Sequence, residues 1–240
     1  MLTIILTLVL ANQVYRWHER YISYRMLGEF LRMSVHLHEL GWSLPASRIN
    51  NLARSAQHDW VSWFFAANVR AMPLPNGSFG AAALAKISHD ISEVLIAGQL
   101  RFHDKRRIEC RGAAHILGYF GRLLFLATLL FAIVRLGLEV YSSNYAESII
   151  FVLSLLCAVL PAASAAFFGL RAYEEFEVLA EQSEQMHDAL VRLQAGIKRV
   201  ALDRTLASQL LGAEMYAVAT IMLSDVTGWI QLFRMKAVDA

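Results

Sequence analysis

The sequence predicts an all-α membrane protein with a two-helix transmembrane hairpin, a partial membrane helix at the amino terminus, and a cytoplasmic helical bundle or coiled coil. Three observations predict this fold class. Hydrophobic residues make up 57% of the 240 residues and charged residues only 18%, whereas soluble domains carry about 25% charged residues. Two long segments are apolar enough to cross a bilayer. Elsewhere, apolar residues recur at helical spacing and do not alternate as they do in strands.

The clearest membrane span covers residues 148–170, which are 23 residues without a charge. At about 1.5 Å per residue, this helix crosses the roughly 30 Å hydrocarbon core with some tilt. A second span, over residues 118–138, has Arg122 near its start and Arg135 near its end. There, a long side chain can snorkel to the headgroups. The short connection between the spans predicts a hairpin within residues 112–170.

A basic cluster before the first span predicts the orientation of the hairpin. It consists of Arg101, Lys105, Arg106, Arg107 and Arg111, while the connection between the spans contains no Lys or Arg. The positive-inside rule then places residues 15–111 and 171–240 in the cytoplasm and the connection between the spans on the outside. The cluster is either this topology signal alone or also a contact surface for anionic lipid headgroups.

The amino terminus is apolar over residues 1–11, about half of a membrane span. A signal peptide is one interpretation, because residues 9–11 resemble a cleavage site. However, no basic residue precedes the apolar run, and Arg16, Arg20 and Arg25 follow it. That polarity favours a partial transmembrane helix over residues 1–14, whose beginning lies upstream of Met1.

Four further helices are expected outside the spans, in addition to the helix that directly follows the second span. The first ends at Gly41 and has the apolar positions Val14, Trp17, Tyr21, Tyr24, Leu27, Leu31 and Val35. The second covers residues 46–72. The third carries Leu84, Ile87, Ile91, Val94, Gly98 and Phe102 on one face, and a break near Gly112 is an option before the first span. The last covers about residues 205–233, with Leu206, Leu210, Ala217, Ile221 and Trp229 as its apolar positions.

The most regular apolar repeat follows the second span. Its positions alternate in steps of three and four: Phe176, Leu179, Ser183, Met186, Leu190, Leu193, Ile197 and Val200. This spacing is typical of a coiled-coil seam. Two interpretations remain open, because the seam can pack within its own subunit or join copies of the chain. As an oligomer seam, its candidate residues are Phe176, Leu179, Met186, Leu190, Leu193 and Ile197.

The second span also presents a candidate pore or packing face. Pro161 removes one backbone hydrogen bond, and the small residues that follow it allow close approach of another helix. Ser154 and Ser164 add weak polarity. The face either packs against another helix or lines a narrow pore in a homo-oligomer, in which case Arg122 would form an anion-selecting or lipid-contacting ring.

Enzymatic chemistry has no support in the sequence. It contains no GxSxG, GxxxxGK[ST] or GxGxxG motif. His36 and His38 are two residues apart and would face different sides of a helix, so we expect neither a metal site nor a cofactor. The net charge of +2 gives no indication of nucleic-acid binding. The expected partners are membrane lipids and further copies of this chain.

The arrangement resembles the SLATT family of bacterial two-transmembrane effector domains, which associate with nucleotide-making (SMODS) and nucleotide-sensing (SLOG) partners. The resemblance is architectural and covers most of the chain. It is carried by RWHERYISYRMLGEFLR (16–32), WVSWFFAANVRAMPLP (60–75), GQLRFHDKRRIECR (98–111), GLRAYEEFEVLAEQSEQM (169–186) and MLSDVTGW (222–229). A departure is the helical region before the hairpin, which is longer than a two-span effector needs.

The resemblance implies an effector in bacterial antiviral defence or stress response that opens a pore or disrupts the inner membrane after a nucleotide signal. Such a protein would have a nucleotide-sensing partner or an upstream sensor domain. The alternative function is a membrane anchor and oligomerisation module that conducts nothing and belongs to a larger nucleotide-sensing protein.

Overall fold

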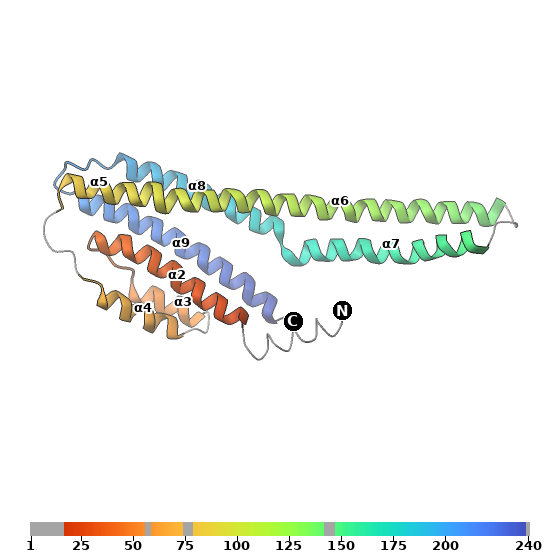
Figure 1. The fold of residues 1–240 in the computed structure, drawn as a ribbon, viewed down its shortest axis with the longest axis horizontal. Coiled ribbons are helices and arrows are strands. Elements are labelled where there is room, and N and C mark those ends of the chain that lie inside the picture. The colour runs from red at the N-terminus through yellow and green to blue at the C-terminus, as the bar shows by residue number, and fades with distance from the viewer. Residues whose placement is uncertain (1–16, 56–58, 74–78, 142–146, 239–240) are drawn as a thin grey trace. The chain divides into compact units, whose positions relative to one another are not determined.

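A computed structural model describes residues 17–55, 59–73, 79–141 and 147–238, and every regular element within these ranges is a helix (Figure 1). The elements are α2 (Trp17–Glu39), α3 (Ala46–Ser55), α4 (Asp59–Ala71), α5 (Ala81–His89), the π-helix η1 (Asp90–Ile96), α6 (Ala97–Tyr141), α7 (Glu147–Glu174), α8 (Phe176–Arg199) and α9 (Ala207–Val238). The all-α prediction is confirmed for these residues. The expected partial membrane helix over residues 1–14 lies outside them.

The chain forms two compact units. The first unit contains residues 1–100 and 188–240, and the second contains residues 101–187. The boundaries fall inside α6 and α8, so each of these helices contributes residues to both units.

The core of the first unit is built on α2 and α9, which pack against each other. Both helices bury side chains at spacings of four, three and four residues, the pattern with which one face of a helix fills the grooves of another. On α2 these side chains are Met26, Phe30, Met33 and Leu37, and on α9 they are Leu211, Met215, Val218 and Met222. The Phe30 ring also meets Phe65 of α4 edge to face, with 5.8 Å between centroids.

The predicted apolar faces of α2 and α9 are wrong by about one residue. Tyr24 and Val35 are exposed on α2, as are Leu206 before α9 and Leu210 on it. Both helices carry apolar side chains around much of their circumference, so their spacing fits more than one face, and packing partners decide which face is buried. Tyr24 instead meets Trp60 of α4 near the surface, with 5.7 Å between centroids.

The single helix expected over residues 46–72 is also wrong. The structure has two helices here, α3 and α4, which pack against each other. One straight helix could not place Ile49 of α3 and Val61 of α4 in the same core, since both are almost fully buried. The expected end of the first helix is confirmed, because α2 ends at Glu39 and Gly41 has a φ of 75°. That conformation favours glycine after a helix.

The buried face predicted for the third helix is correct only as far as η1. Ile91 is buried as expected, but Val94 is 63% exposed, and Leu95 and Ile96 are buried in its place. A π-helix has more residues per turn than an α-helix, so it rotates the face that follows. The carbonyl of Ser92 accepts the backbone N–H of Ala97, five residues on, as a π-helix requires.

In the second unit, α6 runs without a break from the unit boundary to Tyr141 (Figure 1). The optional break near Gly112 is therefore wrong. A glycine inside a helix costs only about 1 kcal/mol relative to alanine, which the long apolar continuation of α6 offsets. Helix α7 follows, with Pro161 inside it, and is continued by α8.

Three helical segments of the described chain are long and apolar enough to cross a membrane. They lie in residues 81–140, 149–199 and 207–228. None of the most apolar window of the first segment is buried, and only 11% of that of the second. Such exposed apolar surface indicates a membrane protein. The third segment, in α9, was not predicted as a span, and 39% of its window is buried.

Candidate membrane-interface site

Helices α6 and α7 contact each other through two glycines of α6. A Cβ atom on Gly118 would lie 2.9 Å from Nη1 of Arg171, and one on Gly121 would lie 3.0 to 3.2 Å from the Phe168 ring. Only glycine therefore fits against α7 at either position without a shift of the neighbouring side chain. Phe120 stacks on Phe167 beside this contact, with 6.0 Å between centroids. Small residues that allow close helix approach are the usual contact surface of membrane helices.

Ser164, a predicted pore or packing residue, lies in this contact. Its side chain is buried, and its hydroxyl donates a 2.8 Å hydrogen bond to the carbonyl oxygen of Gly121. The hydroxyl of Ser154 instead donates to the carbonyl of Ile150 in its own helix, at 2.7 Å. Pro161 is half-buried. The structure thus places Ser164 against α6 and does not bring Ser154 to the same contact.

Arg122, the fourth residue of the predicted face, lies beside Arg171. Arg122 is exposed, and its Nε donates to the carbonyl of Gly118 at 3.1 Å. A Cβ atom on Gly118 would lie 3.7 Å from Nη2 of Arg122, in addition to its contact with Arg171. Two guanidinium groups therefore lie next to each other over one glycine. Nη2 of Arg171 forms an ion pair with Glu177.

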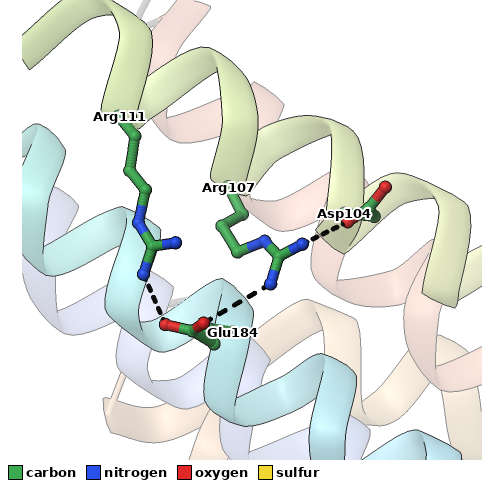
Figure 2. A network of polar contacts seen from close by, with 4 residues as sticks. All are labelled: Asp104, Arg107, Arg111 and Glu184. Carbon is green, nitrogen blue, oxygen red and sulfur yellow. Dashed lines mark hydrogen bonds and ion pairs between the residues drawn. The ribbon is translucent and has the colours of Figure 1, made fainter.

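A second charged group, the Glu184 network, joins α6 to α8 within the second unit (Figure 2). Nη2 of Arg111 lies 2.5 Å from Oε2 of Glu184, and Nη1 of Arg107 lies 3.4 Å from Oε1 of the same carboxylate. Nη2 of Arg107 also lies 2.7 Å from Oδ1 of Asp104. One carboxylate of α8 thus holds two arginines that are one helical turn apart on α6.

The basic cluster is divided by these contacts. Arg107 and Arg111 are held by Glu184, whereas Arg101 is exposed. Lys105 and Glu109 form an exposed pair at 3.6 Å. The guanidinium of Arg106 lies over the Phe102 ring, 5.9 Å from its centroid. Arg101, Lys105 and Arg111 are therefore exposed, Arg106 and Arg107 are half-buried, and Arg107 and Arg111 also serve the packing of α6 against α8.

The junction between α7 and α8 is a single residue, Glu175, with a φ of 50°. This left-handed conformation costs a residue with a side chain about 1 to 2 kcal/mol. Its N–H donates to the carbonyl of Ala172, and its carbonyl accepts the N–H of Leu179, so it ends one helix and starts the next. The ion pair between Arg171 and Glu177 connects the two helices across this residue.

The candidate oligomer seam on α8 is largely covered by the chain itself. Met186, Leu190 and Ile197 are buried, with exposures of 7%, 0% and 1%. The other three candidates, Phe176, Leu179 and Leu193, are half-buried. The buried side chains need no second copy of the chain to remove them from water.

Within the first unit, two side chains of α8 hold the π-helix. Nε2 of Gln194 donates to the carbonyl of Ser92 at 3.0 Å, and Nζ of Lys198 lies 2.8 Å from Oε1 of Glu93. The Lys198 ammonium, as hydrogen-bond donor and as charge, lowers the pKa of Glu93 from 4.5, assisted by the hydroxyl of Ser92. These contacts satisfy and orient a short helix type that is uncommon in proteins.

Sequence reasoning missed Arg171, Glu177 and Glu184. The sequence does contain a signal for Arg171, because this residue is the first charge after the second span and therefore lies level with the start of the first span in a hairpin. The sequence contains no such signal for Glu184, since its partners Arg107 and Arg111 lie more than seventy residues earlier. In the described part of the chain, no three His, Cys, Asp or Glu side chains gather as a metal site requires.

No protein-family model matches the chain, and no curated protein or solved structure is significantly similar to it. The class of protein therefore rests on the fold: a helical membrane protein whose α6 and α7 meet through glycines, with charged groups at one end of that contact.

Proposed function

We propose that residues 118–138 and 148–170 form a transmembrane hairpin in a bacterial inner membrane, with residues 15–111 and 171–240 in the cytoplasm. The exposed apolar surface of α6 and α7 supports the insertion. The basic cluster supports the orientation, because Lys and Arg beside a span are retained on the cytoplasmic side. In this arrangement Gly118, Arg122 and Arg171 lie at the cytoplasmic headgroup level.

In the same proposal, α9 belongs to the cytoplasmic bundle and does not cross the membrane. Its most buried side chains, including Leu211, Met215 and Val218, pack in the core of the first unit. A core helix of a bundle needs a broad apolar face for this purpose, which accounts for a hydropathy near that of a membrane span.

The function that we propose is a membrane effector that acts as a homo-oligomer and, when activated, opens a pore or disrupts the bilayer. The observation that carries it is the continuity of α6 over Ala97–Tyr141. In the proposed insertion, one unbroken helix carries the cytoplasmic arginines of the Glu184 network and the first span. A displacement of the cytoplasmic end of α6 is therefore transmitted along the same helix to its membrane span, as gating requires.

The resemblance to the SLATT family supports the same proposal and adds the biological setting, a bacterial defence or stress system with a nucleotide-sensing partner or domain. The alternative function is a non-conducting anchor. It is favoured by the hydroxyls of Ser154 and Ser164, which are both bonded within one chain. Neither is then required to line a pore.

The test is the membrane potential of bacteria that express the chain, read with a voltage-sensitive dye. Gly121→Leu forces Phe168 away and separates the two spans, whereas Gly137→Leu adds the same side chain to open space on the same helix. We expect depolarisation with the natural chain and with Gly137→Leu, and its loss or alteration with Gly121→Leu. A version lacking residues 118–170 sets the baseline.

Two results would contradict the effector proposal. One is a normal potential at high levels of inserted protein, also when the genes that neighbour it are co-expressed to provide its signal. The other is equal depolarisation by the version without the hairpin, which would trace the effect to expression itself. The first result would favour the anchor.

A further inference from the structure

We propose that the arginine pair, Arg122 and Arg171, binds the phosphate group of an anionic phospholipid. The inference rests on the proposed insertion of the hairpin and not on whether the hairpin conducts. Both guanidinium groups have a nitrogen within 4 Å of a Cβ position on Gly118, Nη2 for Arg122 and Nη1 for Arg171. Two like charges beside one glycine repel each other, and an anion bound between them would remove that repulsion.

The two guanidinium nitrogens within 4 Å of the Cβ position on Gly118 are available for a ligand. Arg122 uses Nε for the carbonyl of Gly118, and Arg171 uses Nη2 for Glu177. Within the ranges that the structure describes, Nη2 of Arg122 and Nη1 of Arg171 donate no hydrogen bond. Guanidinium groups match the spacing of phosphate oxygens, and each can donate two parallel hydrogen bonds.

The arginine pair has one carboxylate partner among the side chains that the structure describes. This partner is Glu177, which pairs with Arg171, while Arg122 forms no ion pair with a described side chain. In the absence of lipid, the carboxylate of Glu177 partly neutralises the arginine pair. A phosphate bound to Nη2 of Arg122 and Nη1 of Arg171 would complete that neutralisation, and the carboxylate of Glu177 would oppose its binding by charge repulsion.

The depth of the pair selects a lipid over other anions. Arg122 lies four residues inside the first span and Arg171 one residue after the second, so both long side chains can reach the headgroup phosphates in the proposed hairpin. Tyr119 and Tyr173, both more than half exposed, lie at the same level. Tyrosines are enriched at membrane interfaces, where one end of the ring is apolar and the hydroxyl is hydrated.

The glycine is part of the site. A side chain at position 118 would occupy the place of the Arg171 guanidinium, since its Cβ alone would lie 2.9 Å from Nη1. The absence of a side chain thus lets both arginines gather at the helix contact, where small residues would otherwise only shorten the distance between the helices.

The experiment counts lipids bound to the purified full-length chain in neutral detergent by native mass spectrometry. The probes are phosphatidylglycerol, phosphatidylcholine and inorganic phosphate. Arg122→Gln and Arg171→Gln should each weaken phosphatidylglycerol binding by about tenfold or more, the loss expected for a charged hydrogen bond. Arg135→Gln removes one arginine near the other end of the same span and should leave the affinity within about twofold.

Glu177→Gln gives the opposite sign, because it removes the opposing carboxylate. We expect it to strengthen phosphatidylglycerol binding by several-fold, a result that a merely structural role of Arg171 would not produce. Arg171→Lys keeps the charge and loses the planar fork, so its affinity should fall between those of the natural chain and Arg171→Gln. Helical circular dichroism of each variant checks that the fold is retained.

The proposal is overturned if the Gln variants bind phosphatidylglycerol as the natural chain does, or if phosphatidylcholine binds equally well at the site. Displacement of phosphatidylglycerol by millimolar inorganic phosphate would support a phosphate site but assign it to the free ion. Its failure to displace the lipid would support the lipid as ligand. Neither lipid result affects the membrane-potential test, so the two proposals fail separately.

Discussion

The hydroxyl of Ser164 donates a 2.8 Å hydrogen bond to the carbonyl oxygen of Gly121, between two helices that are each apolar enough to cross a bilayer. A polar bond of this kind holds two membrane helices at a defined rotation, whereas apolar packing alone leaves rotation less constrained. The contact of α6 with α7 is therefore a specific one.

Ser164→Ala should lower the free energy of unfolding by about 0.6 to 2 kcal/mol, the range for polar contacts between membrane helices. Ser154→Ala is the matched control, because its hydroxyl bonds only within its own helix and its loss should be nearly neutral. Unfolding in mixed detergent micelles, followed by circular dichroism, measures both. Equal effects of the two substitutions would argue against a specific contact at Ser164.

Glu184→Gln should destabilise the packing of α6 on α8 by about 1 kcal/mol, since one carboxylate is shared by Arg107 and Arg111 and all three are partly exposed. The effect should shrink at high salt, which screens exposed charges. Glu109→Gln disrupts only an exposed pair with Lys105 and should cost a few tenths of a kcal/mol at most. Thermal unfolding at low and high salt separates the two, and a salt-independent loss would contradict the prediction.

Glu175→Gly should stabilise the chain by about 1 kcal/mol, because glycine adopts a φ of 50° without the steric cost of a side chain. The same change at Glu181, an exposed position within α8, should destabilise by about 1 kcal/mol. Opposite shifts in melting temperature are the expected outcome. A loss of stability in both variants would mean that Glu175 is not held in the left-handed region.

Leu190→Ala should cost about 2 to 5 kcal/mol, because the side chain is fully buried in the first unit. Val191→Asp changes the next residue, which is 44% exposed, and should leave the stability of the single chain nearly unchanged. Light scattering of both variants then tests self-association independently of folding. If α8 joins copies of the chain, Val191→Asp should alter the oligomer while the fold persists.

The pair of Glu93 and Lys198 predicts a pH dependence. The pKa of Glu93 is lowered in the folded chain, so the ionised pair stabilises the fold above the unfolded-state pKa. This contribution is lost as the pH falls through the folded-state pKa. The difference in melting temperature between the natural chain and Glu93→Gln should therefore be larger at about pH 7 than at about pH 3. A difference that grows on acidification would have the wrong sign.

The helical class and the two apolar spans could be predicted from the sequence because both depend on local composition. A stretch of 23 residues without charge has few alternatives to a membrane or a core helix. The end of α2 could also be predicted from a local signal, since Gly41 follows the last helical turn. These features need no knowledge of the partners that each helix meets.

The buried faces could not be predicted in the same way. On α2 and α9, apolar residues occur around the helix, and the core takes Phe30 and Leu211 where spacing alone favoured Leu31 and Leu210. On α5 and η1, the change of helix type rotates the face after Ile91. A constant period of 3.6 residues contains no information about such a change.

The charged groups of the candidate site depend on pairs that are far apart in the chain. Arg111 and Glu184 are 73 residues apart, and Arg171 reaches Gly118 only because α7 returns beside α6. A hairpin prediction contains the second relation in principle, but it does not say which residues of the two spans share a level. The first relation depends on how α8 continues beyond Glu175.

The two arms of the second unit differ mechanically. Along α6, residues 101–141 form one rod, while the returning arm consists of two helices, α7 and α8, that are joined at Glu175. If the proposed hairpin spans a bilayer that thins or thickens, the simplest response of the rod is to tilt as a whole. The returning arm can keep α8 in place and take up the mismatch at Glu175. The two arms should therefore respond differently to a change in membrane thickness. Bilayers with lipids of graded acyl-chain length would reveal that difference.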